Sequence, residues 1–99
     1  MADRRHYEVL FIVDPRLDDA AIQQSLDRFV AIVTERGGEL TKLDHWGRRK
    51  MTFEMNHLNE GYYAVADLQA EPQAMNELDR VLRLADELIR HKIVRPGKG

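Results

Sequence analysis

The chain has 99 residues, of which 43% are apolar and 32% are charged, a composition typical of a folded domain rather than a disordered segment. It contains no cysteine, which excludes a disulfide framework, a thiolate nucleophile and a thiolate metal site. The formal net charge of −2 argues against nonspecific binding to polyanions. We expect residues 1–99 to form one domain, with a flexible basic end at 96–99.

A strand and a helix are predicted for the first part of the chain. Residues 7–13 are apolar at nearly every position and rich in β-branched and aromatic side chains, which predicts a central strand that ends before Pro15. Asp18 or Asp19 can cap the helix that follows, and Gly37 can end it in the left-handed conformation. The buried face of this helix is predicted from apolar residues at helical spacing: Ile22, Leu26, Phe29, Val30 and Val33.

The next strand is predicted to be irregular. Residues 39–44 alternate in a two-residue period until Leu43, which falls out of phase. The segment His45-Trp46-Gly47 lies where the phase needs resetting, and an extra residue beside a glycine is typical of a β-bulge. Alternation resumes over residues 51–55, where one face is predicted to carry Met51, Phe53 and Met55.

Three more elements complete the predicted fold. A polar loop at 56–61 joins the irregular strand to a return strand at 62–68. Pro72 begins a second amphipathic helix, and residues 88–95 form a last strand. The order β-α-β-β-α-β predicts an α+β, ferredoxin-like sandwich with the first and third strands in the centre. Both helices are then expected on one face of a four-stranded antiparallel sheet.

Catalytic motifs are missing from the sequence. The four histidines lie on separate segments without metal-ligand spacing, and the single serine lies inside the first predicted helix. No phosphate-binding glycine loop and no nucleophile elbow occurs. We therefore expect no enzymatic activity, no metal, no cofactor and no small-molecule substrate. The N-terminus lacks a signal-peptide pattern and no apolar run approaches the ~20 residues of a membrane span, which predicts a cytoplasmic protein without membrane contact.

Charge is sorted along the chain. Residues 54–87 hold eight acids and two bases, whereas residues 88–99 hold four bases and no acid. Three further cations, at 48–50, follow the only tryptophan. They fit either a solvated strand edge whose charges discourage unwanted pairing, or a strand that binds phosphate. Aromatic residues of the central strands are a further candidate surface, for stacking RNA bases: Tyr7 and Phe11, or Tyr62 and Tyr63.

These motifs resemble those of bacterial small-subunit ribosomal protein number six (S six). The resemblance covers almost the whole chain and rests on Arg4-Arg5-His6-Tyr7-Glu8, Trp46-Gly47-Arg48-Arg49-Lys50-Met51-Thr52-Phe53 and Gly61-Tyr62-Tyr63. It implies the ferredoxin-like fold and a structural role: a heterodimer with ribosomal protein number eighteen would bind the central domain of small-subunit ribosomal RNA, among other small-subunit proteins. The sequence departs from the family at Glu54, where many members have proline, and the acidic tail of some members is not carried over.

The resemblance gives the charged and aromatic residues separate tasks. Alternation puts Arg48 and Lys50 on one side of a strand and Arg49 on the other, so one side can meet RNA phosphate and the other the protein partner. Trp46 is expected to anchor the protein contact, or else merely to cover the sheet edge. The predicted RNA-binding residues are Arg4, Arg5, Arg48, Lys50, Arg90 and Lys92. The predicted partner contacts are Trp46, Arg49 and Tyr62.

Two other functional classes use the same fold. One is a regulatory or small-molecule-binding domain that self-associates through its sheet. The other is an acylphosphatase-like enzyme, which would need an arginine-bearing phosphate loop after the first strand, where only Arg16 is present without surrounding glycines. Fold alone does not separate these classes from an RNA-binding protein.

Overall fold

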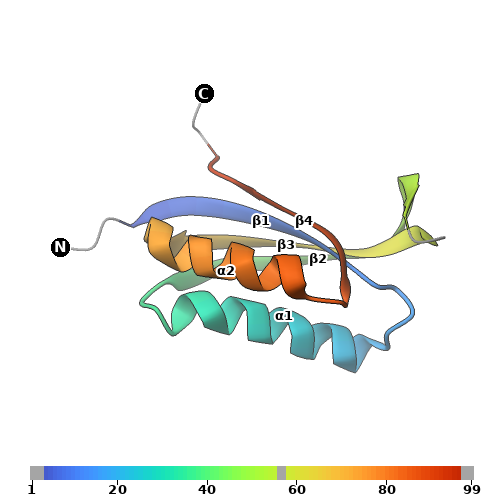
Figure 1. Cartoon of the computed structure of the whole chain (residues 1–99), viewed down its shortest axis with the longest axis horizontal. Coiled ribbons are helices and arrows are strands. Elements are labelled where there is room, and N and C mark those ends of the chain that lie inside the picture. Colours follow the sequence, from blue (N-terminus) through green and yellow to red (C-terminus); the bar gives the residue numbers. More distant parts are fainter. Residues whose placement is uncertain (1–3, 56–57, 97–99) are drawn as a thin grey trace.

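The computed structural model describes the backbone of residues 4–55 and 58–96 and the side chains of residues 4–51 and 59–96. The element order is the predicted one, β-α-β-β-α-β (Figure 1). The bounds are β1 Arg5–Val13, α1 Asp19–Thr34, β2 Glu39–Met55, β3 Leu58–Ala70, α2 Pro72–Leu84 and β4 Leu88–Val94. The basic end predicted to be flexible lies outside the described residues from position 97 onward.

One antiparallel sheet runs in the order β2-β3-β1-β4, so the first and third strands are central as predicted. Both helices cover the same face of this sheet (Figure 1). Alternate residues of β1 and β3 point into the layer between sheet and helices, and Phe11 stacks on Phe29 of α1 with ring centroids 5.8 Å apart. The opposite, helix-free face is called the open face below.

The two ends of α1 follow from local chemistry. The Asp18 carboxylate accepts a hydrogen bond from the Ala21 backbone N–H at 2.8 Å and so caps α1, as predicted. Gly37 has φ +86°, which favours glycine, and it reverses the chain toward β2.

Glu87, just before β4, accepts hydrogen bonds from Ser25 and Arg28 and thereby links the start of β4 to α1.

The strand β2 contains the predicted bulge and two further register shifts, one of them between Lys50 and Met55. Its register against β3 shifts between His45 and Gly47, as expected, and also between Leu40 and Lys42. The second shift explains why Leu43 falls out of phase in the sequence. The predicted loop at 56–61 was too long, because β3 already begins at Leu58; positions 56 and 57 lie outside the described residues.

Side chains of the sheet itself bury one another at only one end of the open face. Near the β2–β3 hairpin, Ile12 and Met51 are buried there although no helix covers them. A Cβ on Gly61 would lie 2.4 Å from Ile12 and 3.5 Å from the Met51 sulfur, so glycine lets these side chains close over the strand. Phe53 and Met55, predicted to share the face of Met51, have side chains outside the described set.

Two features that the described residues lack bear on function. None of the described helices is long and apolar enough to cross a membrane. No group of three or more histidine, aspartate or glutamate side chains in the described part of the chain is placed to hold a metal ion.

Candidate binding surfaces of the sheet

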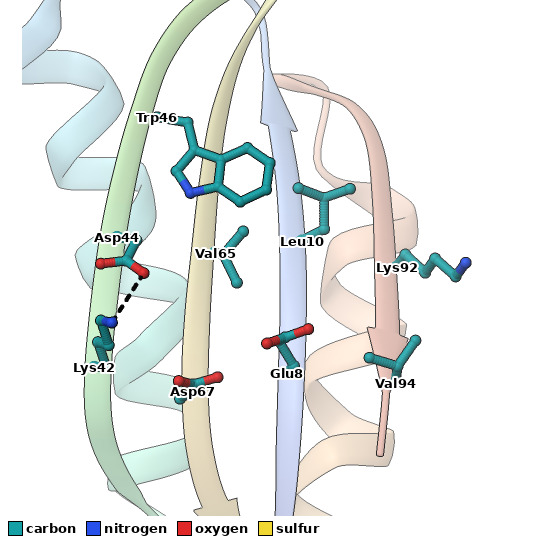
Figure 2. A pocket seen from close by; sticks show the side chains of 9 residues that line it. All are labelled: Glu8, Leu10, Lys42, Asp44, Trp46, Val65, Asp67, Lys92 and Val94. Carbon is teal, nitrogen blue, oxygen red and sulfur yellow. Dashed lines mark ion pairs between the residues drawn. The ribbon is translucent and has the colours of Figure 1, made fainter. Parts of the chain in front are cut away.

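Trp46 lies on the open face because of the bulge in β2. It is the extra residue at the register shift between His45 and Gly47. Gly47 has φ +83°, a conformation that glycine adopts without the steric cost paid by other residues. The indole is 47% exposed and extends across β3 toward Leu10 of β1 (Figure 2).

Two neighbours hold the indole in place. The Tyr63 ring stacks on it with centroids 6.4 Å apart and planes inclined by 9°. The Arg49 guanidinium lies 5.3 Å from the indole centroid, and Arg49 Nε donates a hydrogen bond to the Trp46 carbonyl. Stacking and cation–π contacts each add to the area these rings bury. Trp46 is therefore an exposed aromatic surface that is already ordered before any partner arrives.

Beside the indole the open face is hollowed. The hollow has a volume of about 420 Å³ and combines apolar and charged lining (Figure 2). Its lining residues come from all four strands: Glu8, Leu10, Lys42, Asp44, Trp46, Val65, Asp67, Lys92 and Val94. Lys42 and Asp44 pair with each other at 3.5 Å. A mixed surface of this kind suits a protein segment better than a strand of phosphates, because three carboxylates lie in it.

Arg48 lies on the opposite side of β2 and is held by contacts within the chain. Its Nη1 lies 2.9 Å from the Asp19 carboxylate, and its other nitrogens donate to the carbonyls of Pro15 (3.1 Å) and Leu17 (2.9 Å). Its guanidinium also lies 5.7 Å from the ring centroid of Tyr62. Arg48 thus fastens β2 to the β1–α1 loop, a structural task that the sequence does not reveal.

Tyr62 and Tyr63 take opposite faces. Tyr62 packs toward the helices, where its hydroxyl lies 2.9 Å from His45 Nδ1, whereas Tyr63 lies on the open face beneath Trp46. Tyr7 and Phe11 are buried on the helix side, so they offer no surface on which bases could stack. The predicted partner contact at Tyr62 is therefore separated from Trp46 and Arg49 by the sheet itself.

The other predicted RNA-binding cations lie in two places. Arg4 reaches Glu39 at 3.4 Å and also the Gly37 carbonyl, at one end of β1. Lys92 stands opposite Leu10 in the β1–β4 register, and Arg90 opposite Ile12. Arg5 lies five residue steps along β1, about 17 Å, from Leu10, the residue opposite Lys92, so the two sets are separated along the strand.

Lys50 lies on the Arg48 side of β2 and is exposed. It stands opposite Glu60, whereas Arg49 stands opposite Gly61. The predicted alternation of the three cations about the strand is thus confirmed. Lys50 and Arg49 point to different sides, as a strand with two binding tasks would need.

Comparison with known proteins decides the family. The family model for ribosomal protein S6 matches residues 6–95. The chain belongs to this family. It is 40% identical over 94 residues to small ribosomal subunit protein bS6 of Desulforamulus reducens, covering 95% of this chain and 99% of that protein. The bS6 protein of Acidothermus cellulolyticus is 45% identical over 92 residues, with 93% and 96% covered.

A solved structure agrees with the fold of the chain. The crystal structure of 30S ribosomal protein S6 from Thermotoga maritima superposes with a TM-score of 0.87 at 31% identity, covering 94% of this chain and 88% of that one. Membership in the S6 family confirms the predicted family and fold and the cytoplasmic location of a bacterial ribosomal protein. The family consists of structural ribosomal proteins rather than enzymes.

Several surface residues of this S6-family chain escaped the sequence analysis. Tyr63 could not be told from Tyr62, because two adjacent tyrosines fit either phase of a strand. Glu8 and Asp67 did carry a signal: each is the one charged residue in a predicted central strand, 7–13 or 62–68. Such a residue marks the face of the strand that the helices leave uncovered.

Proposed function

We propose that the chain is a structural component of the bacterial small ribosomal subunit and binds the central domain of small-subunit ribosomal RNA together with ribosomal protein number eighteen. Family membership supports the ribosomal role, and the relatives named above are small ribosomal subunit proteins. The RNA and the partner protein go beyond what those names state.

The observation that carries the proposal is the division of the surface. The stacked aromatic pair Trp46–Tyr63 and the hollow beside it occupy the open face. Exposed cations lie on the two edge strands, Lys50 on β2 and Arg90 and Lys92 on β4, and Lys92 also lines the hollow. Aromatic anchors next to a hollow favour a protein contact, whereas lysine and arginine at an edge favour phosphate.

The assignments of individual residues follow this division. On the protein side, Trp46 and Arg49 contact the partner directly, while Tyr62 acts from the other face by supporting His45 and Arg48. On the RNA side, Lys50 is the leading phosphate contact of β2, because Arg48 is occupied with the β1–α1 loop. The remaining proposed RNA contacts are Arg4, Arg5, Arg48, Arg90 and Lys92.

The charge of the chain implies that RNA binding depends on the partner. A formal net charge of −2 gives little overall attraction for a polyanion, and the edge cations are few. A basic partner seated on the open face would add the missing charge. The chain alone is then a weak RNA binder, and the pair is a strong one.

Sedimentation of a tagged chain from bacterial lysate tests the ribosomal role. The chain should migrate with the small ribosomal subunit and remain there after the subunits are separated at low magnesium. A ferredoxin-like protein of similar size with the same tag serves as the control and should stay at the top of the gradient. If the tagged chain stays there too, although folded, the proposal is wrong.

A further inference from the structure

Two carboxylates face each other on the open face without a cation between them. Glu8 of β1 stands directly opposite Asp67 of β3 in the strand register. Directly opposed like charges destabilise a sheet, so such a pair is not explained by the stability of the isolated chain. Figure 2 shows both carboxylates side by side in the hollow, below the Trp46 indole.

Within the chain, the Glu8 and Asp67 carboxylates form few hydrogen bonds or ion pairs. Asp67 Oδ1 is shielded from solvent yet has no hydrogen-bond partner among the described residues. His6 Nε2 lies 3.6 Å from this oxygen, too far for a hydrogen bond but close enough for an ion pair when the imidazole is protonated. Within the described part of the chain, the Glu8 carboxylate has neither a hydrogen bond nor an ion pair. Both carboxylates therefore retain hydrogen-bonding capacity that the described residues do not use, and both line the hollow.

The cations of the same hollow are directed elsewhere. Lys42 stands directly opposite Asp67 in the β2–β3 register, but its ammonium pairs with Asp44 at 3.5 Å. The Lys92 side chain points away from Glu8 and Asp67, toward the outer edge of β4 (Figure 2). The lining thus holds three carboxylates and two ammonium groups, and neither ammonium forms an ion pair with Glu8 or Asp67 in the described part of the chain.

Apolar groups surround this acidic centre. Leu10 and Val65 lie between the two carboxylates and Trp46, and Val94 lies beside Glu8 (Figure 2). An occupant must therefore offer a positive group with apolar atoms next to it. Phosphate fails both requirements, whereas an arginine or lysine side chain of a protein, flanked by an apolar residue, meets them.

We propose that Glu8 and Asp67 together receive a basic side chain of the partner protein, whose adjacent apolar residue packs on Trp46, Leu10 and Val65. The proposal rests on the proposed function, because it assumes that a protein docks on the open face. It adds the chemistry of the contact and two residues that neither the sequence analysis nor the comparisons assign. The fixed positions of Trp46 and the two strands mean that the site is formed before the partner binds.

The test is calorimetric titration of the chain with ribosomal protein number eighteen from the same bacterium, using the double variant Glu8→Gln/Asp67→Asn. The amides keep the shape of the site and remove its charge. We expect binding to weaken at least ~10-fold, since a charge of the partner would be buried without its counter-ions. The affinity of the double variant should also depend less on salt than that of the wild type.

Controls separate the possible causes of a loss. The matched variant Glu35→Gln/Asp86→Asn removes the same charge from exposed positions outside the hollow and should bind like the wild type. The double variant should unfold at the same or a higher denaturant concentration than the wild type, because a repulsive pair has been removed. A folded double variant with unchanged affinity would overturn the inference and leave the proposed function standing.

Two further outcomes would also decide the matter. If the wild-type chain does not bind the partner at all, the proposed function fails, and the inference fails with it. If the double variant instead loses affinity for RNA in the absence of the partner, the open face binds RNA and the proposed occupant is wrong.

Discussion

The guanidinium of Arg48 lies 2.9 Å from the carboxylate of Asp19 and so ties the second strand to the first turn of α1. Two backbone carbonyls of the β1–α1 loop accept hydrogen bonds from the same guanidinium. A residue of the charged motif that the sequence suggests for RNA binding is thus also part of the scaffold. The consequences for stability and for RNA binding can be measured separately.

Arg48→Ala should lower the free energy of unfolding by about 1–2 kcal/mol. Three hydrogen bonds are lost, each contributing about 0.5–1.5 kcal/mol, and partial exposure of the side chain reduces their sum. Arg49→Ala, whose guanidinium contacts only Trp46 in the described structure, is the control and should cost less than about 0.5 kcal/mol. Urea denaturation measures both, and equal losses would contradict the scaffold role of Arg48.

Acid should destabilise the fold partly through Glu87. Burial tends to raise the pKa of this carboxyl, but a backbone hydrogen bond and the hydrogen bonds from Arg28 and Ser25 outweigh it, so the pKa is lowered. Its stabilising effect is therefore full above the unfolded-state pKa of about 4.3 and is lost as the pH falls through the folded-state value. Glu87→Gln should narrow the difference in unfolding free energy between pH 7 and pH 3.

The control for Glu87 is Glu35→Gln, an exposed residue at the end of α1. This variant should retain the pH dependence of the wild type. If Glu87→Gln and Glu35→Gln show the same pH profile, the hydrogen bonds of Glu87 do not contribute to acid stability.

Trp46 provides its own reporter of partner binding, because it is the only tryptophan in the chain. Its indole is 47% exposed, so its fluorescence should shift to shorter wavelength when a protein covers the open face. Titration with ribosomal protein number eighteen should produce this shift, whereas polylysine, which is basic but offers no apolar surface, should not. Calorimetric binding without any spectral change would show that the partner docks elsewhere.

RNA binding by the complete pair should distinguish the two sides of β2. Lys50→Ala removes a proposed phosphate contact and should reduce the slope of log affinity against log salt by about 0.9 or less. Arg49→Ala, on the side of Trp46, should weaken partner binding and leave the salt slope of the assembled complex unchanged. Equal slopes for the two variants would refute the two-sided use of the strand.

The sequence predicted the architecture because its local signals agree with one another. The apolar stripe of α1 and its Asp18 cap point to the same helix, and the mostly apolar β1 marks a central strand. The bulge at Trp46 was visible because a glycine accompanies the change of phase. The bulge near Thr41 carries no such glycine, so only the displaced Leu43 hinted at it.

The binding surfaces were less predictable, because they depend on register between strands. Only the pairing of Gly47 with Tyr63 and of Arg48 with Tyr62 decides which tyrosine supports the tryptophan. The contacts of Arg48 within the chain depend on the path of the β1–α1 loop, which the periodicity of apolar residues in the sequence does not predict. The opposition of Glu8 and Asp67 likewise appears only when β1 and β3 are aligned.

Filter-binding titration of a central-domain RNA fragment tests the central claim most directly, with the chain alone, ribosomal protein number eighteen alone, and both together. We expect weak binding by the chain alone and an affinity at least ~10-fold higher when the partner is present, within the usual range of coupling between binding sites. Tight binding by the chain alone, unchanged by the partner, would contradict it.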